Sequence, residues 1–88
     1  MIYRLASGKR FSKRYRKLDK ATRVKVKATL HKLEADPFHP GLRTEKLQGF
    51  DNVWSARVDF HYRISFKLAD GIIMLRNVGP HDELYASP

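Results

Sequence analysis

Residues 53–68, VWSARVDFHYRISFKL, hold two runs in which apolar and polar side chains alternate, separated by the three-residue segment 59–61. Such alternation is typical of antiparallel strands that bury one face. The only register that sets apolar against apolar residues along both runs pairs Trp54 with Phe66. The stretch therefore predicts a β-hairpin closed by a three-residue turn.

The same register sets Arg57 directly opposite Arg63 on the polar face of the hairpin. Like charges that face each other across two strands destabilise the pair by about 0.2 to 1 kcal/mol. A protein tolerates such a pair where an anion binds between the two groups. Alternatively, both side chains extend over the sheet and their guanidinium groups diverge into water. The pair is therefore a candidate anion-binding site, and divergence of the two guanidinium groups into water stays open as the alternative.

The segments around the hairpin predict the remaining elements. Residues 2–6 predict a strand, residues 8–18 a basic helix, and residues 19–35 a second helix that Asp19 can cap and that ends before a proline. Two prolines and two glycines indicate a loop over residues 37–49. With the hairpin and one final strand, the order is β-α-α-β-β-β, an α+β fold.

The final strand follows the dipeptide Asp70 and Gly71. A two-residue turn there would place Ile73 and Leu75 in the core and Arg76 on the face that holds Arg57 and Arg63. A three-residue turn would reverse these faces. The Asp-Gly pair favours the two-residue turn.

Length and charge limit the function. The 88 residues predict one domain, spanning 1–88. Eighteen Lys and Arg against nine Asp and Glu give a net charge of +9, which favours nucleic acid or an acidic protein as partner over a membrane. The absence of cysteine excludes disulfides, Cys-ligated zinc and thiol nucleophiles. No signal-peptide or membrane-spanning run is seen, so we expect a cytoplasmic protein.

Many basic side chains lie outside the hairpin turn and the chain's last segment. We predict that they bind RNA, although a solvated surface is the ordinary alternative. They are Lys9, Arg10, Lys13, Arg14, Arg16, Lys17, Arg43, Lys67 and Arg76.

Residues 79–85, GPHDELY, end the final strand at a Gly-Pro break and add titratable groups beside the basic face. His81 and Tyr85 are four residues apart and would share one side of a helical turn. Cleavage of RNA without a metal needs a base for the 2′-hydroxyl, cations for the transition state and an acid for the leaving 5′-oxygen. Histidine and arginine can supply these functions.

At these residues the chain resembles the RelE/ParE superfamily of toxins from toxin-antitoxin systems. The segments that carry the resemblance are EKLQG, WSARVDFHYRISFKL and LRNVGPHDELY, and the last is most similar to RelE and YafQ-like mRNA endonucleases. The resemblance implies a mostly antiparallel four-stranded sheet with two N-terminal helices on one face, and no metal or other cofactor. It also implies a type II toxin that cuts mRNA in the ribosomal A site.

The resemblance further implies partners and site residues. A cognate acidic antitoxin would bind the basic surface, making a hetero-oligomer of a toxin that is monomeric when free. His81 matches the family's general acid or base, and Tyr85 matches the aromatic residue after it. The other matching site positions are Arg57, Arg63, Lys46 and His61. RelE itself lacks this histidine, and YafQ-like members have an acid at the position of His61, so the general base stays open among His61, Lys46 and Tyr85.

Two other functions stay open. A ParE-like protein would inhibit DNA gyrase and cleave nothing, but ParE-like members generally lack the terminal histidine. The third possibility is an RNA-binding domain without catalytic activity.

Overall fold

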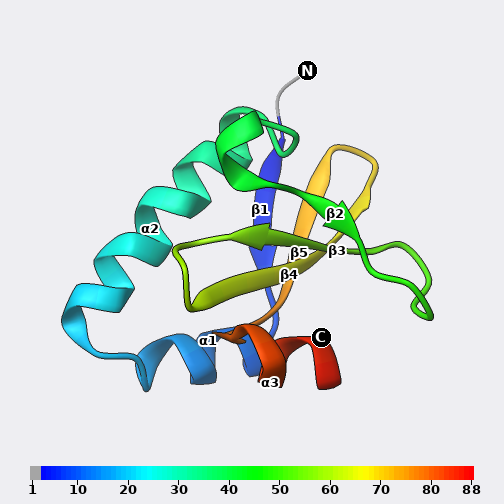
Figure 1. Ribbon diagram of the computed structural model, residues 1–88. Coiled ribbons are helices and arrows are strands. Elements are labelled where there is room, and N and C mark those ends of the chain that lie inside the picture. Colours follow the sequence, from blue (N-terminus) through cyan, green and yellow to red (C-terminus); the bar gives the residue numbers. More distant parts are fainter. Residues whose placement is uncertain (1–2) are drawn as a thin grey trace.

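The computed structural model describes residues 3–88, which form five strands, three α-helices and one 3-10 helix (Figure 1). The sheet has the order β1-β5-β4-β3-β2, in which β1 is parallel to β5 and the other neighbours are antiparallel. The elements are β1 (Arg4–Ser7), α1 (Lys9–Arg16), α2 (Lys20–Ala35), η1 (Pro40–Leu42), β2 (Glu45–Lys46), β3 (Val53–Arg57), β4 (Tyr62–Ala69), β5 (Ile72–Pro80) and α3 (His81–Ala86).

The sequence-based fold is correct in its class but wrong in two details. The sheet has five strands rather than four, because β2 pairs with β3 at the sheet edge inside the segment predicted as a loop. A third helix, α3, follows β5 directly. Both elements are too short to show a hydrophobic period in the sequence.

The hairpin of β3 and β4 has the predicted register. Trp54 pairs with Phe66, and Arg57 lies directly opposite Arg63. The turn is closed by the side chain of Asp59, whose carboxylate accepts hydrogen bonds of 2.8 Å from the backbone N–H groups of His61 and Tyr62. This local acceptor fixes the hairpin tip relative to the two strands.

The turn between β4 and β5 is the predicted two-residue turn. Asp70 and Gly71 have φ angles of 52° and 75°, the left-handed pair that a tight hairpin turn requires. Ile73 and Leu75 are buried in the core, as expected. A bulge opposite the step from Ser65 to Phe66 makes Arg76 the extra residue of β5, which the sequence did not predict.

The helices α1 and α2 bury their apolar side chains against one face of the sheet. Asp19 caps α2 by accepting a 2.7 Å hydrogen bond from the backbone N–H of Thr22. The core joins both helices to the central strands, and its buried members are Phe11, Val26, Leu33, Leu42, Ala56, Ile64, Phe66, Ile73, Leu75 and Val78. The helix α3 packs on the opposite face of the sheet.

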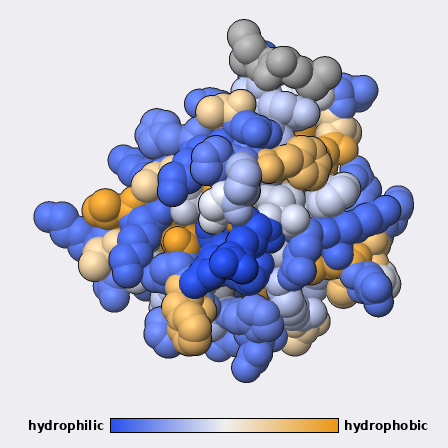
Figure 2. Space-filling model, turned by 45° about the horizontal axis from the view of Figure 1, so that its top comes forward, coloured by the Kyte–Doolittle hydropathy of each residue, from blue (hydrophilic) through white to orange (hydrophobic). Residues whose placement is uncertain are grey.

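The surface is mainly polar. Figure 2 shows one side of the molecule, largely hydrophilic with separate apolar patches. The exposed large apolar side chains of residues 3–88 belong to different segments, and they are Val24, Phe38, Phe50, Phe60 and Met74. None of the helices in the described part of the chain has the length and apolar character needed to span a bilayer.

Candidate active site

The helix α3 packs on the polar face of the sheet, at the end of the molecule where α1 also lies (Figure 1). Leu84 is fully buried, and the Tyr85 hydroxyl lies 3.1 Å from Ser55 Oγ. Asn77 Nδ2 donates a 3.0 Å hydrogen bond to the carbonyl oxygen of Ser87. The polar face predicted from the alternation is therefore partly covered by α3, with a buried polar layer beneath the helix.

Tyr85 stands at the centre of this covered region. Its hydroxyl donates a short hydrogen bond to the carboxylate of Glu45 and also contacts Ser55. Burial raises the pKa of Tyr85 above its usual value, and the hydrogen bond to Glu45 raises it further, against weaker opposing effects of Ser55 and Arg63. Near neutral pH, Tyr85 is therefore a hydrogen-bond donor.

Arg63 reaches the same region from β4. Its side chain is only 16 % exposed, and its Cζ lies 5.8 Å from the centroid of the Tyr85 ring. Nη1 of Arg63 is 4.0 Å from Glu45 Oε1, which is an ion pair but too far for a hydrogen bond. Within residues 3–88 this buried nitrogen has no hydrogen-bond partner. An unsatisfied buried donor costs about 1 to 3 kcal/mol, so a bound anion would stabilise it.

His81 lies against the ring of Tyr85, with the two ring centroids 4.3 Å apart. Its side chain is half exposed, and Nδ1 is 3.1 Å from the Asp82 carboxylate. The backbone N–H of His81 donates a 2.9 Å hydrogen bond to the carbonyl oxygen of His61, which ties the start of α3 to the hairpin tip. The structure thus brings His81, Tyr85 and Arg63 together.

The other three predicted site residues lie around this centre. Arg57 is opposite Arg63, and its Nε donates to the carbonyl oxygen of Asp59 at 3.3 Å. His61 is exposed at the hairpin tip and shares a groove with His81. Lys46 pairs with Trp54, so strand alternation sends it to the face away from Arg63, although it borders a hollow that Tyr85 also lines.

Three of the nine predicted binding residues contact the end of the chain. Arg10 donates to Ser87 Oγ at 2.9 Å and to the Pro88 carbonyl oxygen at 3.3 Å. Arg76 also donates to that carbonyl oxygen, at 3.4 Å, and Arg14 forms a 3.2 Å ion pair with Glu83. These contacts hold α3 in place. The remaining residues lie on the surface with exposed or half-buried side chains, and they are Lys9, Lys13, Arg16, Lys17, Arg43 and Lys67.

Glu45 is the site residue that the sequence analysis missed. It pairs with Ser55 in the sheet, so its side chain lies on the face of Arg63 and Tyr85. The signal was present in the segment EKLQG, but only the pairing of β2 with β3 shows which side of the edge strand faces the site. In the described part of the chain, no three His, Cys, Asp or Glu side chains gather as a metal site would require.

Exchanging the charges of Arg14 and Glu83 tests whether α1 positions α3. We expect Arg14→Glu or Glu83→Arg alone to weaken α3 docking and lower thermal stability, and the double variant Arg14→Glu/Glu83→Arg to recover much of the loss. The pair is exposed, so each single change should cost only about 0.2 to 1 kcal/mol of stability beyond its own charge effects. Thermal unfolding provides the measurement. If Arg14 served only to bind RNA, the exchange would give no recovery.

The titration of Tyr85 gives a pH prediction. Because its folded pKa is raised, the contribution to stability is complete below the unfolded value of 10.0 and is lost as pH rises through the folded value. The absorbance of the four tyrosines, followed during an alkaline titration, should therefore include one step above the ordinary tyrosine pKa of 10.0, called the late step below. Tyr85→Phe should remove that step alone. A late step that persists in the variant would belong to another tyrosine and contradict the assignment.

Comparisons with known proteins find the same fold in toxins. No model of a known protein family and no curated sequence matches the chain. RelE of the RelE–RelB complex from Pyrococcus horikoshii is 25% identical, with 91% of this chain and 96% of that chain covered and a TM-score of 0.75. YafQ of the E. coli DinJ–YafQ toxin-antitoxin complex is 19% identical, with 97% and 99% covered and a TM-score of 0.78. The YoeB/ParE toxin of Agrobacterium tumefaciens is 17% identical, with 89% and 98% covered and a TM-score of 0.76. The structural neighbours are thus RelE, YafQ and YoeB toxins, and the chain has the fold of the RelE/ParE superfamily that its sequence resembles.

Proposed function

We propose that this chain is the toxin of a type II toxin-antitoxin system and cleaves mRNA on the ribosome. The observation that carries the proposal is the buried Nη1 of Arg63, which has no hydrogen-bond partner within residues 3–88 and lies near Glu45 and near the Tyr85 ring that His81 packs against. A site of this kind offers a positive charge to a phosphate, a carboxylate and an imidazole for proton transfer, and a hydroxyl donor between them.

The roles in the reaction follow from the chemistry of each group. Glu45 accepts the proton of the 2′-hydroxyl, and the 2′-oxygen attacks the adjacent phosphorus. Arg63 and the Tyr85 hydroxyl stabilise the charge that develops on the phosphate oxygens. The bond from phosphorus to the 5′-oxygen breaks as His81 donates a proton to that oxygen. The products are a 2′,3′-cyclic phosphate and a 5′-hydroxyl.

We propose Glu45 as the general base in preference to the three candidates from the sequence, Tyr85, Lys46 and His61. The raised pKa of Tyr85 opposes its ionisation, and strand alternation directs Lys46 to the other face. The carbonyl oxygen of His61 accepts a hydrogen bond from the backbone N–H of His81, the first residue of α3. The His61 ring packs against Phe60, with ring centroids 5.2 Å apart. The carboxylate of Glu45 accepts a hydrogen bond from the Tyr85 hydroxyl group, which is the kind of contact that a general base makes with its substrate.

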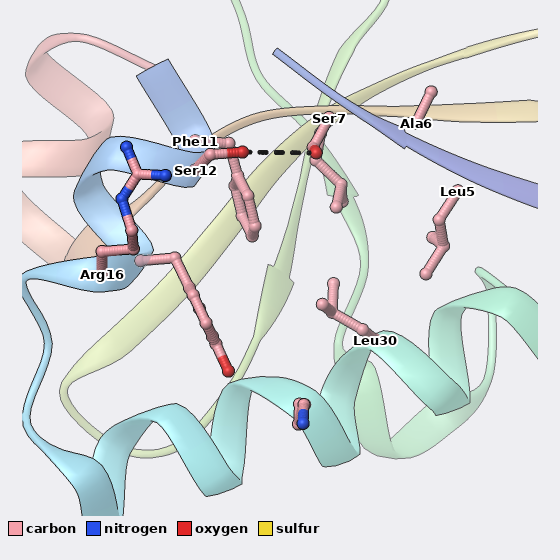
Figure 3. Close-up of a pocket in the computed structure, with 10 residues that line it drawn as sticks. Leu5, Ala6, Ser7, Phe11, Ser12, Arg16 and Leu30 are labelled. Atoms are coloured by element: carbon pink, nitrogen blue, oxygen red, sulfur yellow. Dashed lines mark hydrogen bonds between the residues drawn. The ribbon is translucent and has the colours of Figure 1, made fainter. Parts of the chain in front are cut away.

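We also propose that an acidic antitoxin is the second partner. An apolar groove of about 450 Å³ opens between β1, α1 and α2, and Figure 3 shows Leu5, Phe11 and Leu30 along it. Arg16 and Lys27 line the same groove. Together with the net charge of +9, this arrangement favours an amphipathic segment with acidic flanks.

Mapping cleavage on a translated message tests the proposed activity. Primer extension on ribosomes with the purified protein should show cuts within the A-site codon, and the 3′ ends should carry a cyclic phosphate. A DNA supercoiling assay with gyrase, run in parallel, should show no inhibition. Inhibited gyrase with intact mRNA would favour the ParE-like alternative, and neither effect would favour an RNA-binding domain without activity.

A further inference from the structure

A groove of about 650 Å³ lies where the tip of the β3–β4 hairpin meets the start of α3. The hydrogen bond from His81 N–H to the His61 carbonyl oxygen joins its two walls. Its lining residues are Phe60, His61, Pro80, His81, Asp82 and Glu83. Because His81 belongs both to this groove and to the proposed active site, a ligand in the groove would lie next to the reacting phosphate.

Phe60 gives the groove an aromatic wall. Its side chain is 81% exposed, the largest value among the exposed apolar residues of the described chain. Its ring meets the His61 ring edge to face at an interplanar angle of 84°. The Asp59 carboxylate, which also forms a 3.2 Å ion pair with Lys25, fixes the turn that carries Phe60. An exposed aromatic ring on a fixed turn is suited to stack on a flat, unpaired base.

The charges in the groove identify the part of RNA that fits. The six lining residues include no lysine or arginine, and Asp82 and Glu83 would repel a phosphate. Carboxylate oxygens accept hydrogen bonds from the exocyclic amino groups of adenine, cytosine and guanine. The side chain of Asp82 is fully exposed, with one carboxylate oxygen 3.1 Å from Nδ1 of His81 and the other free of hydrogen bonds and ion pairs in the described chain, whereas Glu83 is engaged by Arg14. The groove is therefore matched to a nucleobase with an amino group.

We propose that this groove binds the base of the nucleotide on the 3′ side of the cut, stacked on Phe60 with its amino group on Asp82. The inference rests on the proposed function, in which His81 protonates the leaving 5′-oxygen. The nucleotide that carries this oxygen must lie on the His81 side of the phosphate, which is the side of the groove. The cut would then favour adenine, cytosine or guanine over uracil at that position.

Binding of uncleavable RNA tests the proposal without relying on catalysis. The probes are 2′-O-methyl tetranucleotides that carry cytosine, uracil or no base at the position 3′ of the central linkage, titrated by NMR. Loss of the base should weaken binding to the wild-type protein by about 5- to 150-fold, the usual effect of one base on an aromatic platform. Phe60→Ala should weaken binding of the cytosine probe by a similar factor and leave the abasic probe unaffected.

Three further variants separate stacking from other effects. Phe60→Trp keeps an aromatic surface and should retain the affinity of Phe60. Val24→Ala, which shortens another exposed apolar side chain on α2, should change nothing. Asp82→Asn should remove the preference for cytosine over uracil.

The outcomes distinguish this inference from the proposed function. If Phe60→Ala and wild type bind the cytosine probe equally, or if Phe60→Ala loses antitoxin binding instead, the base site is overturned. Cleavage of mRNA by the wild type would then still support the nuclease. Binding that depends on Phe60, in a protein that cuts no translated message, would support the base site and contradict the nuclease.

Discussion

His81→Ala is expected to lower the rate of mRNA cleavage by about 100- to 10,000-fold, the usual contribution of a general acid. The centroid of the imidazole lies 4.3 Å from that of the Tyr85 ring, which Arg63 also approaches, and the imidazole is half exposed, so substrate can reach it. Removing the ring leaves the hydrogen bond from the backbone N–H to His61 intact. The fold and antitoxin binding should therefore be preserved while growth arrest is lost.

A matched control makes this test sharper. His31→Ala is the matched control because His31 is exposed on α2, and its cleavage rate should equal that of the wild type. A His81→Ala protein that arrests growth as strongly as the wild type would show that the acid is another group.

The hairpin and its neighbours could be predicted because their signals are local. Alternation along residues 53–68 fixes the register, and Asp70 with Gly71 fixes a two-residue turn. The cap at Asp19 and the proline after residue 36 define the second helix. Each of these features is decided by residues only a few positions apart, so one sequence is enough to read them.

The geometry of the site depends on contacts between distant segments. Glu45 reaches Tyr85 across 40 positions of sequence through a strand of two residues, and Arg10 reaches Ser87 across 77. Hydrophobic periodicity carries no information on such pairs. The sequence could therefore place His81 and Tyr85 near Arg63, but it could not show that Glu45 joins them or that Arg10 and Arg14 contact α3.

The position of α3 changes the chemistry that the arginines can perform. On an open sheet, water would screen Arg63, and its attraction for a phosphate would be weak. Beneath α3 its side chain is only 16% exposed, above buried Ser55 and Ser65. A phosphate entering there exchanges an unsatisfied donor for a charge-assisted hydrogen bond in a drier environment. The helix thus supplies His81 and Tyr85, and it also strengthens the attraction of Arg63 for a phosphate.

Glu45→Gln is expected to reduce cleavage by about 100- to 10,000-fold, because an amide cannot accept the 2′ proton. Glutamine keeps the shape and an acceptor oxygen for Tyr85, so the sheet edge and α3 should stay in place. Single-turnover cleavage on ribosomes measures the loss.

A structural readout shows whether Glu45→Gln acts on chemistry alone. Glu45 is one cause of the raised pKa of Tyr85, so the late tyrosine step should move toward lower pH but stay present, since burial is the larger cause. Glu34→Gln removes the same charge from the exposed surface of α2 and should leave cleavage and the tyrosine step unchanged. If Glu45→Gln shifts the tyrosine step as expected yet cleaves at the wild-type rate, the carboxylate only orients Tyr85. The general base would then have to come from His61 or from the ribosome itself.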